Sequence, residues 1–181
     1  MVTELQQRKF TKLFSIYDAN NNGVLAKDDF EQIIQKLAEL RGWKQGSPEY
    51  NTLFDKYIFY WQHIRDAADK NRDDTVTLEE WFAYHQKLLS TKDSYEEQVG
   101  KLAALVCDVF DADNDGHLNI KEFEQVFLVY NTPRVFVPYI FSRLDLNGDR
   151  LLSKQEVLQL LYEFHFSDDP EAPGNLLFGP Y

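Results

Sequence analysis

The stretch DADNDGHLNIKE, residues 111–122, decides the fold of this 181-residue chain. Carboxylates occupy its first, third and fifth positions, glycine its sixth and glutamate its twelfth, which matches the oxygen ligands that a calcium ion requires. Gly116 can adopt the positive φ that folds a loop around an ion, and Leu118 at the eighth position is expected to point into the core. The predicted ligands are Asp111, Asp113, Asp115, the carbonyl of His117, Asn119 directly or through water, and Glu122.

Apolar residues flank this loop on both sides at the spacing of a helix face. They are Ala103, Val106, Cys107 and Phe110 before the loop, and Phe123, Val126, Phe127 and Tyr130 after it. A helix, a twelve-residue calcium loop and a second helix form a unit that resembles the EF-hand.

The same frame recurs at residues 18–29 (DANNNGVLAKDD), 69–80 (DKNRDDTVTLEE) and 145–156 (DLNGDRLLSKQE). Four loops with apolar flanks in register make a chance match improbable. In chain order these are the first to fourth loops, the one at residues 111–122 being the third. The predicted ligands in the other three are Asp18, Asn20, Asn22, Val24 and Asp29 in the first, Asp69, Asn71, Asp73, Thr75, Thr77 and Glu80 in the second, and Asp145, Asn147, Asp149, Leu151, Ser153 and Glu156 in the fourth.

The four loops differ in quality. Asp74 replaces the turn glycine in the second loop at modest cost, whereas Arg150 replaces it in the fourth at a cost of about 1 kcal/mol, which should weaken that site. In the first loop Ala26 offers no side-chain ligand and Asp29 is one methylene shorter than glutamate, which favours the smaller Mg²⁺. We expect three to four Ca²⁺ ions, with Mg²⁺ competing mainly at the first loop; an empty first loop is the alternative.

Capping residues, glycines and prolines predict where the helices begin and end. In the first half, the expected helices run from a capping box of Thr3 and Gln6 to about Tyr17, from Lys27 to Arg41 before Gly42, and from Pro48 after Ser47 to about Ala68. The helix that follows the second loop should end near Ser90, and the next helix should begin at a capping box of Ser94 and Glu97. The last helix is expected from Ser153 to Phe166. The helix after Thr132 and Pro133 should have a kink or a late start at Pro138.

The predicted fold is all-α, with four EF-hands in two paired lobes packed into one compact body. Paired loops should form short β-contacts that satisfy their backbone groups, with residues 24–26 facing 75–77 and residues 117–119 facing 151–153. We place the N-terminal pair at residues 1–91 and the C-terminal pair at 92–166. The tail, residues 167–181, carries Leu176, Leu177, Phe178 and Tyr181, so we expect it to fold back over an apolar groove, the alternative being disorder.

The composition excludes several classes of protein. A net charge of -11 argues against nucleic acid or an anionic membrane as the main partner. The single cysteine, Cys107, excludes an internal disulfide and suits a buried thiol in a reducing compartment. No apolar run reaches the 18 residues that a membrane span needs, and neither a signal peptide nor a myristoylation site stands at the start. A cytoplasmic monomer is expected.

No motif in the sequence predicts catalysis, so we expect no enzyme. The four histidines, His63, His85, His117 and His165, lack zinc-site spacing. The abundant aromatic residues, 14 Phe, 10 Tyr and 3 Trp, predict a large aromatic core. The alternative is a cavity for an apolar ligand, as in the photoproteins and coelenterazine-binding proteins that share this four-hand frame. Trp61, Trp81, His85 and His165 are the candidate lining residues.

The chain resembles the sarcoplasmic calcium-binding proteins and their prokaryotic relatives of the calerythrin type. The resemblance rests on the length, the four hands, the aromatic stretch before the second loop and the tail of the form SDDP…APGN…FGP. It implies two lobes that pack together. The second loop of many relatives is degenerate, whereas residues 69–80 look competent here.

Two functional classes follow. One is an intracellular calcium buffer or transporter. The other is a calcium sensor that exposes an apolar surface to a target protein, or less favourably a calcium-regulated binder of an apolar small molecule. Sensors use flexible, Met-rich grooves, and the sole methionine here is Met1, so the buffer is favoured.

Overall fold

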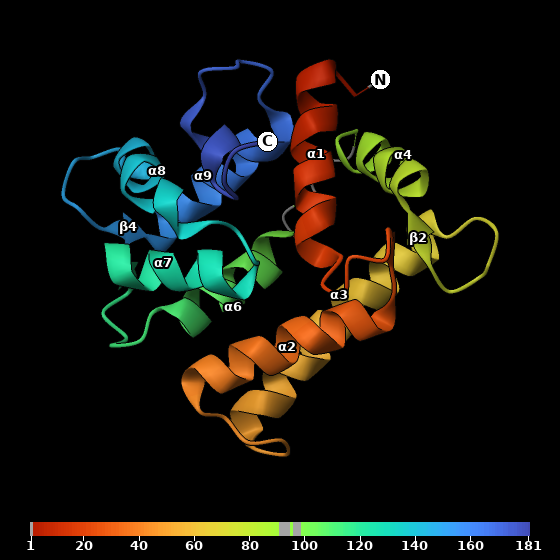
Figure 1. Cartoon of the computed structure of the whole chain (residues 1–181), viewed down its shortest axis with the longest axis horizontal. Coiled ribbons are helices and arrows are strands. Elements are labelled where there is room, and N and C mark those ends of the chain that lie inside the picture. Colours follow the sequence, from red (N-terminus) through yellow and green to blue (C-terminus); the bar gives the residue numbers. More distant parts are fainter. Residues whose placement is uncertain (1, 91–94, 96–98) are drawn as a thin grey trace.

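The computed structural model describes residues 2–90, 95 and 99–181. This part of the chain contains eight α-helices, and the predicted all-α class is confirmed (Figure 1). They are α1 (Glu4–Tyr17), α2 (Lys27–Arg41), α3 (Pro48–Ala68), α4 (Leu78–Leu88), α6 (Lys101–Phe110), α7 (Ile120–Val129), α8 (Val137–Leu144) and α9 (Lys154–Phe166). Two short 3₁₀ helices, η2 (Arg134–Phe136) and η3 (Pro173–Leu176), accompany them.

Local capping fixes most helix ends where the sequence predicts them. The Thr3 side chain caps α1 and Gln6 completes the capping box, while Gly42 ends α2 at φ 67°. Pro138 lies in the first turn of α8, after η2, so α8 starts late rather than kinking. Helix α4 ends at Leu88, two residues earlier than expected. The predicted boundary at residues 91–93 and the predicted capping box of Ser94 and Glu97 lie outside the described residues.

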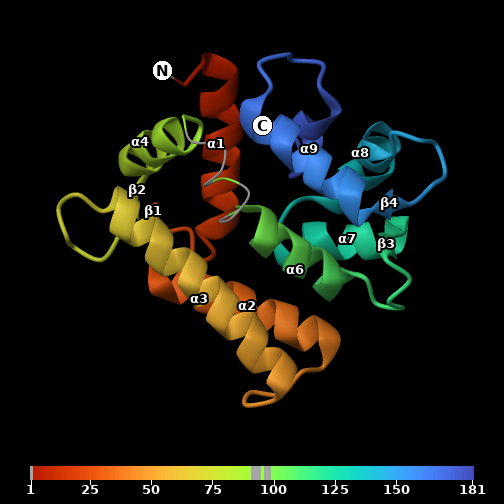
Figure 2. The same ribbon diagram turned by 180° about the vertical axis from the view of Figure 1, so that it is seen from behind.

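The loops pair through two-stranded antiparallel sheets, visible from behind in Figure 2. Strand β1 (Val24–Leu25) pairs with β2 (Val76–Thr77), with Val24 opposite Thr77. Strand β3 (His117–Leu118) pairs with β4 (Leu152–Ser153), with His117 opposite Ser153. The predicted pairing and register are therefore confirmed, and Leu118 is buried as expected.

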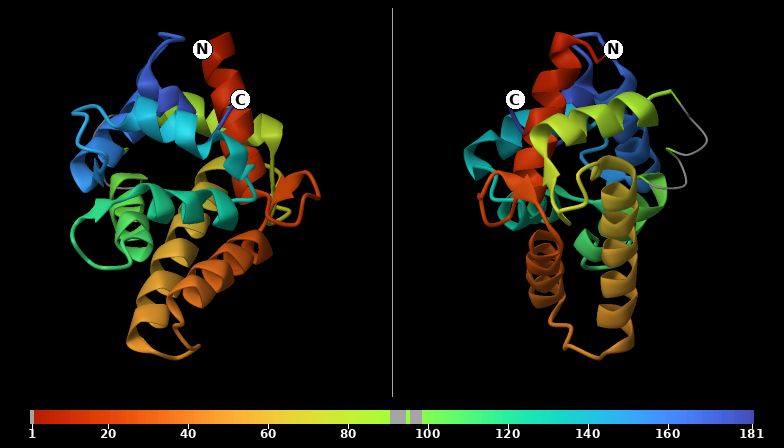
Figure 3. Two further views of the ribbon diagram at one scale, coloured as in Figure 1. Left: turned by 60° about the vertical axis from the view of Figure 1, so that its left-hand side comes forward. Right: turned by 90° about the vertical axis from the view of Figure 1, so that its right-hand side faces the viewer.

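One hydrophobic core extends through both halves of the chain. Helix α1 runs between α4 and α9 in Figures 1 and 2 and contacts both. Further contacts between the halves join α3 to α6 and α2 to α7. The α2–α3 pair projects from the rest of the molecule in both views of Figure 3. Among the described helices, none combines the length and the apolarity that a membrane crossing requires.

The tail lies on the body of the protein, where η3 packs against α9 and α8. Leu177 and Asn175 are buried, and the buried ammonium of Lys9 on α1 donates to the carbonyl of Ser167 (2.8 Å) and to Asn175 Oδ1 (3.0 Å). The backbone of Gly174 sits so close to α9 that a Cβ there would lie 2.3 Å from the carbonyl oxygen of Leu160. The tail therefore joins α1 to α9 as well as covering apolar surface.

Candidate functional site

The four loops share one backbone conformation, with left-handed residues at the fourth and sixth positions of each. The sequence predicts the sixth position, but the requirement at the fourth was not anticipated. In the fourth loop the glycine stands at the fourth position, which leaves arginine at the sixth. The residues and their φ angles are Asn21 (58°) and Gly23 (85°), Arg72 (61°) and Asp74 (61°), Asn114 (58°) and Gly116 (86°), and Gly148 (77°) and Arg150 (68°).

An aspartate at the first position closes each loop from the end of the preceding helix. In the third loop the carboxylate of Asp111 accepts the N–H groups of Asp115 (3.1 Å) and Gly116 (2.8 Å). Asp18, Asp69 and Asp145 accept N–H groups of their own loops in the same way. These bonds curl the backbone so that the side chains of the alternating positions approach one another.

The carboxylate at the twelfth position reaches back across each loop. Glu122 accepts the N–H of Asn119 through Oε2 (2.9 Å) and that of Ala112 through Oε1 (2.8 Å). Glu80 makes the matching pair of bonds to Thr77 (3.0 Å) and Lys70 (3.1 Å), and the hydrogen bond from the Thr77 N–H is the main cause that lowers the pKa of Glu80.

The twelfth residue of the fourth loop has an unpaired oxygen. Glu156 Oε2 accepts from the Ser153 N–H (2.9 Å), but Oε1 is buried without a hydrogen-bond partner in the described part of the chain. A buried carboxylate oxygen without a donor is costly unless a cation binds it. This oxygen therefore fits the ligand role predicted for Glu156.

The first loop has a different closure because its twelfth residue is aspartate. Asp29 Oδ1 accepts from Asn20 at the third position (3.2 Å), whereas glutamate in the second and third loops reaches the second position. The Asp29 side chain is fully buried, and burial raises its pKa against the opposing hydrogen bonds from Ala26 and Asn20. The shorter side chain of Asp29 therefore bonds the backbone N–H of the third loop position instead of the second.

The third loop brings three carboxylates together. Asp111, Asp113 and Asp115 each have an oxygen within 4.8 Å of the others, as a metal site requires. In the second and fourth loops the third and fifth positions also touch, since Asn71 donates to Asp73 (2.8 Å) and Asn147 donates to Asp149 (2.9 Å). All the donors are hard oxygens, which suit Ca²⁺ or Mg²⁺ rather than a softer metal.

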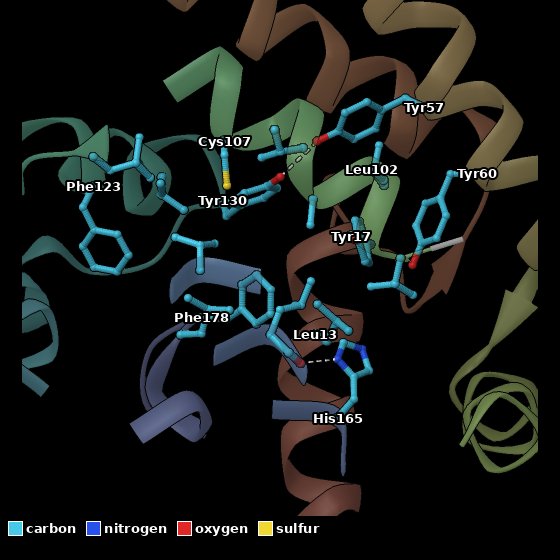
Figure 4. Close-up of a pocket in the computed structure, with 18 residues that line it drawn as sticks. Leu13, Tyr17, Tyr57, Tyr60, Leu102, Cys107, Phe123, Tyr130, His165 and Phe178 are labelled. Carbon is cyan, nitrogen blue, oxygen red and sulfur yellow. Dashed lines mark hydrogen bonds between the residues drawn. The ribbon is translucent and has the colours of Figure 1, made fainter. Parts of the chain in front are cut away.

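A cavity of about 80 Å³ lies between the two halves (Figure 4). Helices α1, α3, α6, α7 and α9 line it, together with Leu177 and Phe178 of the tail. Its surface is mainly apolar, and the hydroxyls of Tyr57 and Tyr130 share a hydrogen bond (3.0 Å), while the rings of Tyr17 and Tyr60 lie 6.0 Å apart between centres.

Of the four candidate lining residues, only His165 lines this cavity. Trp61, Trp81 and His85 are buried in the aromatic core, where Trp81 Nε1 donates to the Phe10 carbonyl (2.9 Å). Cys107 also lines the cavity, and burial raises the pKa of its thiol to about 12, so the expected buried thiol is confirmed.

Comparison with known proteins places these features in context. The family model described as "EF hand" matches residues 108–128, which include the third loop. Calerythrin from Saccharopolyspora erythraea is 26% identical over 168 residues, covering 92% of this chain and 95% of calerythrin.

Solved structures agree on the fold. A sarcoplasmic calcium-binding protein from amphioxus superposes with a TM-score of 0.83 at 20% identity, covering 100% of both chains. A coelenterazine-binding protein from Renilla muelleri superposes with a TM-score of 0.70 at 19% identity, covering 99% of this chain and 100% of the other. The predicted resemblance to calerythrin and the sarcoplasmic calcium-binding proteins is therefore confirmed, in sequence by calerythrin and in fold by the amphioxus structure, and the third loop with its flanks matches the EF-hand model.

Proposed function

We propose that the protein binds three to four Ca²⁺ ions at its four loops and acts as a cytoplasmic, non-catalytic calcium buffer. The single observation that carries the proposal is the shared geometry of the loops, in which a first-position aspartate and a twelfth-position carboxylate both accept backbone N–H groups of a loop with two left-handed residues. The names of the relatives, calerythrin and sarcoplasmic calcium-binding protein, support the same ligand.

The ligands are the loop residues named from the sequence. Bound calcium supplies positive charge that offsets the clustered carboxylates. In the second to fourth loops the side chains of the first, third, fifth, ninth and twelfth positions hold the ion, together with the carbonyl of the seventh position. The first loop lacks the ninth-position ligand because that residue is Ala26. In the first loop, the buried Asp29 and the tighter closure favour Mg²⁺ in competition with Ca²⁺.

Packing favours a buffer over a sensor. A sensor must expose an apolar groove on binding calcium, whereas here the buried apolar residues of both halves form one core and the tail packs over α8 and α9. The protein is expected to act as a monomer, with no nucleic acid or membrane as partner.

Calcium stoichiometry tests the ligand assignment. We expect Glu122→Gln to lower the number of ions bound by one, because the amide cannot offer two anionic oxygens to the ion. Isothermal titration calorimetry at constant Mg²⁺ would measure it. Glu124→Gln is the matched control, since Glu124 lies outside the loop and pairs on the surface with Arg134 (3.6 Å). Unchanged stoichiometry in Glu122→Gln would contradict the assignment.

Fluorescence of the apolar dye ANS separates buffer from sensor. Along a calcium titration of the metal-free protein, a buffer should start bright and lose ANS signal, because metal binding completes the folding of a loose chain. A rising signal would mean that calcium exposes an apolar surface, and would favour the sensor.

The cavity between the halves supports a second candidate function, binding of a small apolar aromatic molecule. We expect benzene to raise the melting temperature of the calcium-loaded protein, because a mainly apolar cavity can bind such molecules. Ala103→Leu, which adds volume at the lining, should abolish the shift. An equal shift in the variant would place benzene elsewhere.

A further inference from the structure

Helix α2 belongs to the first hand but ends on the third loop. The guanidinium Nη1 of Arg41, the last residue of α2, donates to the carbonyl oxygen of Asp111 at 2.9 Å. Asp111 is the first residue of the third loop and lies 70 residues away in the sequence. In Figures 1 and 2, α2 extends from the first loop toward the side of the molecule that carries the third.

This bond reaches the twelfth residue of the third loop through a single peptide group. The peptide between Asp111 and Ala112 accepts from Arg41 at its carbonyl and donates from its N–H to Glu122 Oε1 (2.8 Å). Donation to the carbonyl polarises the peptide and strengthens its own N–H as a donor. Arg41 therefore helps to orient the carboxylate that the proposed site needs to hold with both oxygens.

The end of α2 is built to hold Arg41 in place. Gly42 in the left-handed conformation lets Trp43 donate its N–H back to the Ala38 carbonyl (2.9 Å), as in a Schellman motif. The turn places the guanidinium of Arg41 over the ring of Trp43, with 5.8 Å between the Arg41 Cζ atom and the ring centre. Among the described residues of the other loops, no side chain donates to the carbonyl of the first position.

The opposite end of α2 belongs to the first loop. Asp29 lies in the first turn of α2, and its carboxylate accepts from Ala26 and Asn20. Midway along the helix, Lys36 Nζ lies 3.4 Å from the carbonyl of Val129 at the end of α7, the helix that leaves the third loop. A rigid helix of 15 residues thus connects the first loop to both sides of the third.

We propose that Arg41 is a positioning residue for the third loop, and that α2 couples the two sites so that filling the first loop raises the calcium affinity of the third. The proposal rests on the proposed function, because it assumes that the third loop binds calcium. The sign of the effect distinguishes positioning from simple electrostatics. Removing a positive charge near an acidic site should tighten calcium binding by electrostatics, whereas loss of positioning should weaken it.

Glycine amide signals give three of the four loops a reporter of their own. The chain has eight glycines, and Gly23, Gly116 and Gly148 lie in the first, third and fourth loops. Titrating ¹⁵N-glycine-labelled protein with chelator-buffered calcium yields a midpoint for each of these amides. We expect Arg41→Gln to raise the calcium midpoint of Gly116 roughly tenfold, as losses of outer-shell partners do. Arg41→Lys keeps the charge and one donor and should restore part of the affinity.

The control is Arg134→Gln, which removes the same charge at a surface ion pair in the half of the molecule that carries the third loop. It should leave the Gly116 midpoint unchanged or lower it. An Arg41→Gln midpoint equal to that of the wild type would overturn the positioning role. If Gly116 of the wild type does not respond to calcium at all, the proposed function fails first.

The coupling is tested with Asp29→Asn, which weakens the first loop. In the wild-type background this change should raise the Gly116 midpoint roughly fivefold, within the usual range of coupling between sites. In the Arg41→Gln background it should cause a much smaller further shift, because only the contact of Lys36 with Val129 still joins α2 to the third hand. The coupling would be overturned if Asp29→Asn left the calcium midpoint of Gly116 unchanged. It would also be overturned if the shifts caused by Arg41→Gln and Asp29→Asn added fully in the double variant.

Discussion

Arg150 holds a left-handed backbone at the sixth position of the fourth loop, with φ 68°. An L-residue with a Cβ pays about 1–2 kcal/mol there, and glycine would remove most of that strain while losing about 0.5–1 kcal/mol through its freer unfolded chain. We expect Arg150→Gly to raise the free energy of unfolding by about 0.5 kcal/mol and to lower the calcium midpoint of Gly148. Urea unfolding of the calcium-loaded protein measures the first effect.

Arg150→Lys is the matched control, because it keeps both the charge and the Cβ. It should leave the free energy of unfolding where it is. A stabilisation by lysine equal to that by glycine would show that the backbone is not the source of the effect.

Two buried histidines predict acid sensitivity. His85 on α4 and His165 on α9 stack at 5.9 Å between ring centres. Burial lowers the pKa of His85 to about 3, assisted by the charge of His165, and lowers that of His165 to about 4. The unfolded chain, with a histidine pKa of about 6.5, therefore binds more protons than the folded one between these values. Their contribution to stability is complete above about pH 6.5 and is lost as the pH falls toward 4.

Urea unfolding of the calcium-loaded protein between pH 7.5 and 5 tests this, with a slope of up to about 1.4 kcal/mol per pH unit for each histidine. His165→Gln should reduce the slope. His63→Gln, at a partly exposed position, is the control and should retain it. The same slope in wild type and His165→Gln would mean that other groups, such as the loop carboxylates, cause the acid sensitivity.

The sequence predicts loop residues well because their roles depend on spacing within twelve positions. It does not reveal that Asn21, Arg72 and Asn114 must be left-handed, since many residue types tolerate that position at moderate cost. The bond from Arg41 to Asp111 has no local signal at all, because only the folded chain brings these residues together.

At the scale of elements, the tail depends on Gly174. Its φ is not left-handed, so alanine is acceptable to the local backbone, but the added Cβ would lie 2.3 Å from the Leu160 carbonyl and 2.6 Å from Glu163 Cβ. We expect Gly174→Ala to destabilise the protein by about 1–3 kcal/mol through overpacking and to increase ANS binding as η3 lifts from α9. Thermal unfolding and ANS fluorescence measure the two effects.

Gly100→Ala is the control, because a Cβ there meets nothing within 4 Å and its φ is also not left-handed. It should leave ANS fluorescence unchanged and raise the melting temperature slightly, because alanine has a less free unfolded chain than glycine. Normal stability in Gly174→Ala would mean that the tail can shift without loss of contact.

Helix ends can be predicted from the sequence because capping boxes, Ser47–Pro48 and Gly42 act locally on the backbone.

The position of the tail cannot be predicted in the same way. Its apolar residues indicate that it must be covered, but the choice of α8 and α9 as its partners, and of Lys9 as its anchor, depends on surfaces formed by distant segments. The predicted lining of the cavity was wrong for the same reason. Trp61 and Trp81 pack in the core, whereas four tyrosines, Tyr17, Tyr57, Tyr60 and Tyr130, line the cavity.

At the scale of the whole molecule, the contacts between the halves predict that they unfold together. Tyr57 and Tyr130 share a hydrogen bond across the cavity (3.0 Å), Gln6 Nε2 donates to the His165 carbonyl (3.2 Å), and Lys9 is anchored in the tail. Because one core extends through both halves, neither can lose its packing without exposing apolar surface of the other.

The tryptophans and glycines allow this cooperativity to be measured half by half. All three tryptophans, Trp43, Trp61 and Trp81, lie in the N-terminal half, whereas Gly116 and Gly148 lie in the C-terminal half. In urea at saturating calcium, tryptophan fluorescence and the native Gly116 and Gly148 amide signals should be lost at the same midpoint. The Gly23 signal is the internal control. Because Gly23 lies in the same half as the tryptophans, its signal should be lost at the midpoint of the fluorescence change whether or not the halves unfold together. If the native Gly116 and Gly148 signals were lost at a different urea concentration from the Gly23 signal, the two halves would unfold independently. The coupling of the first and third calcium sites would then depend on helix α2 alone and not on the shared core.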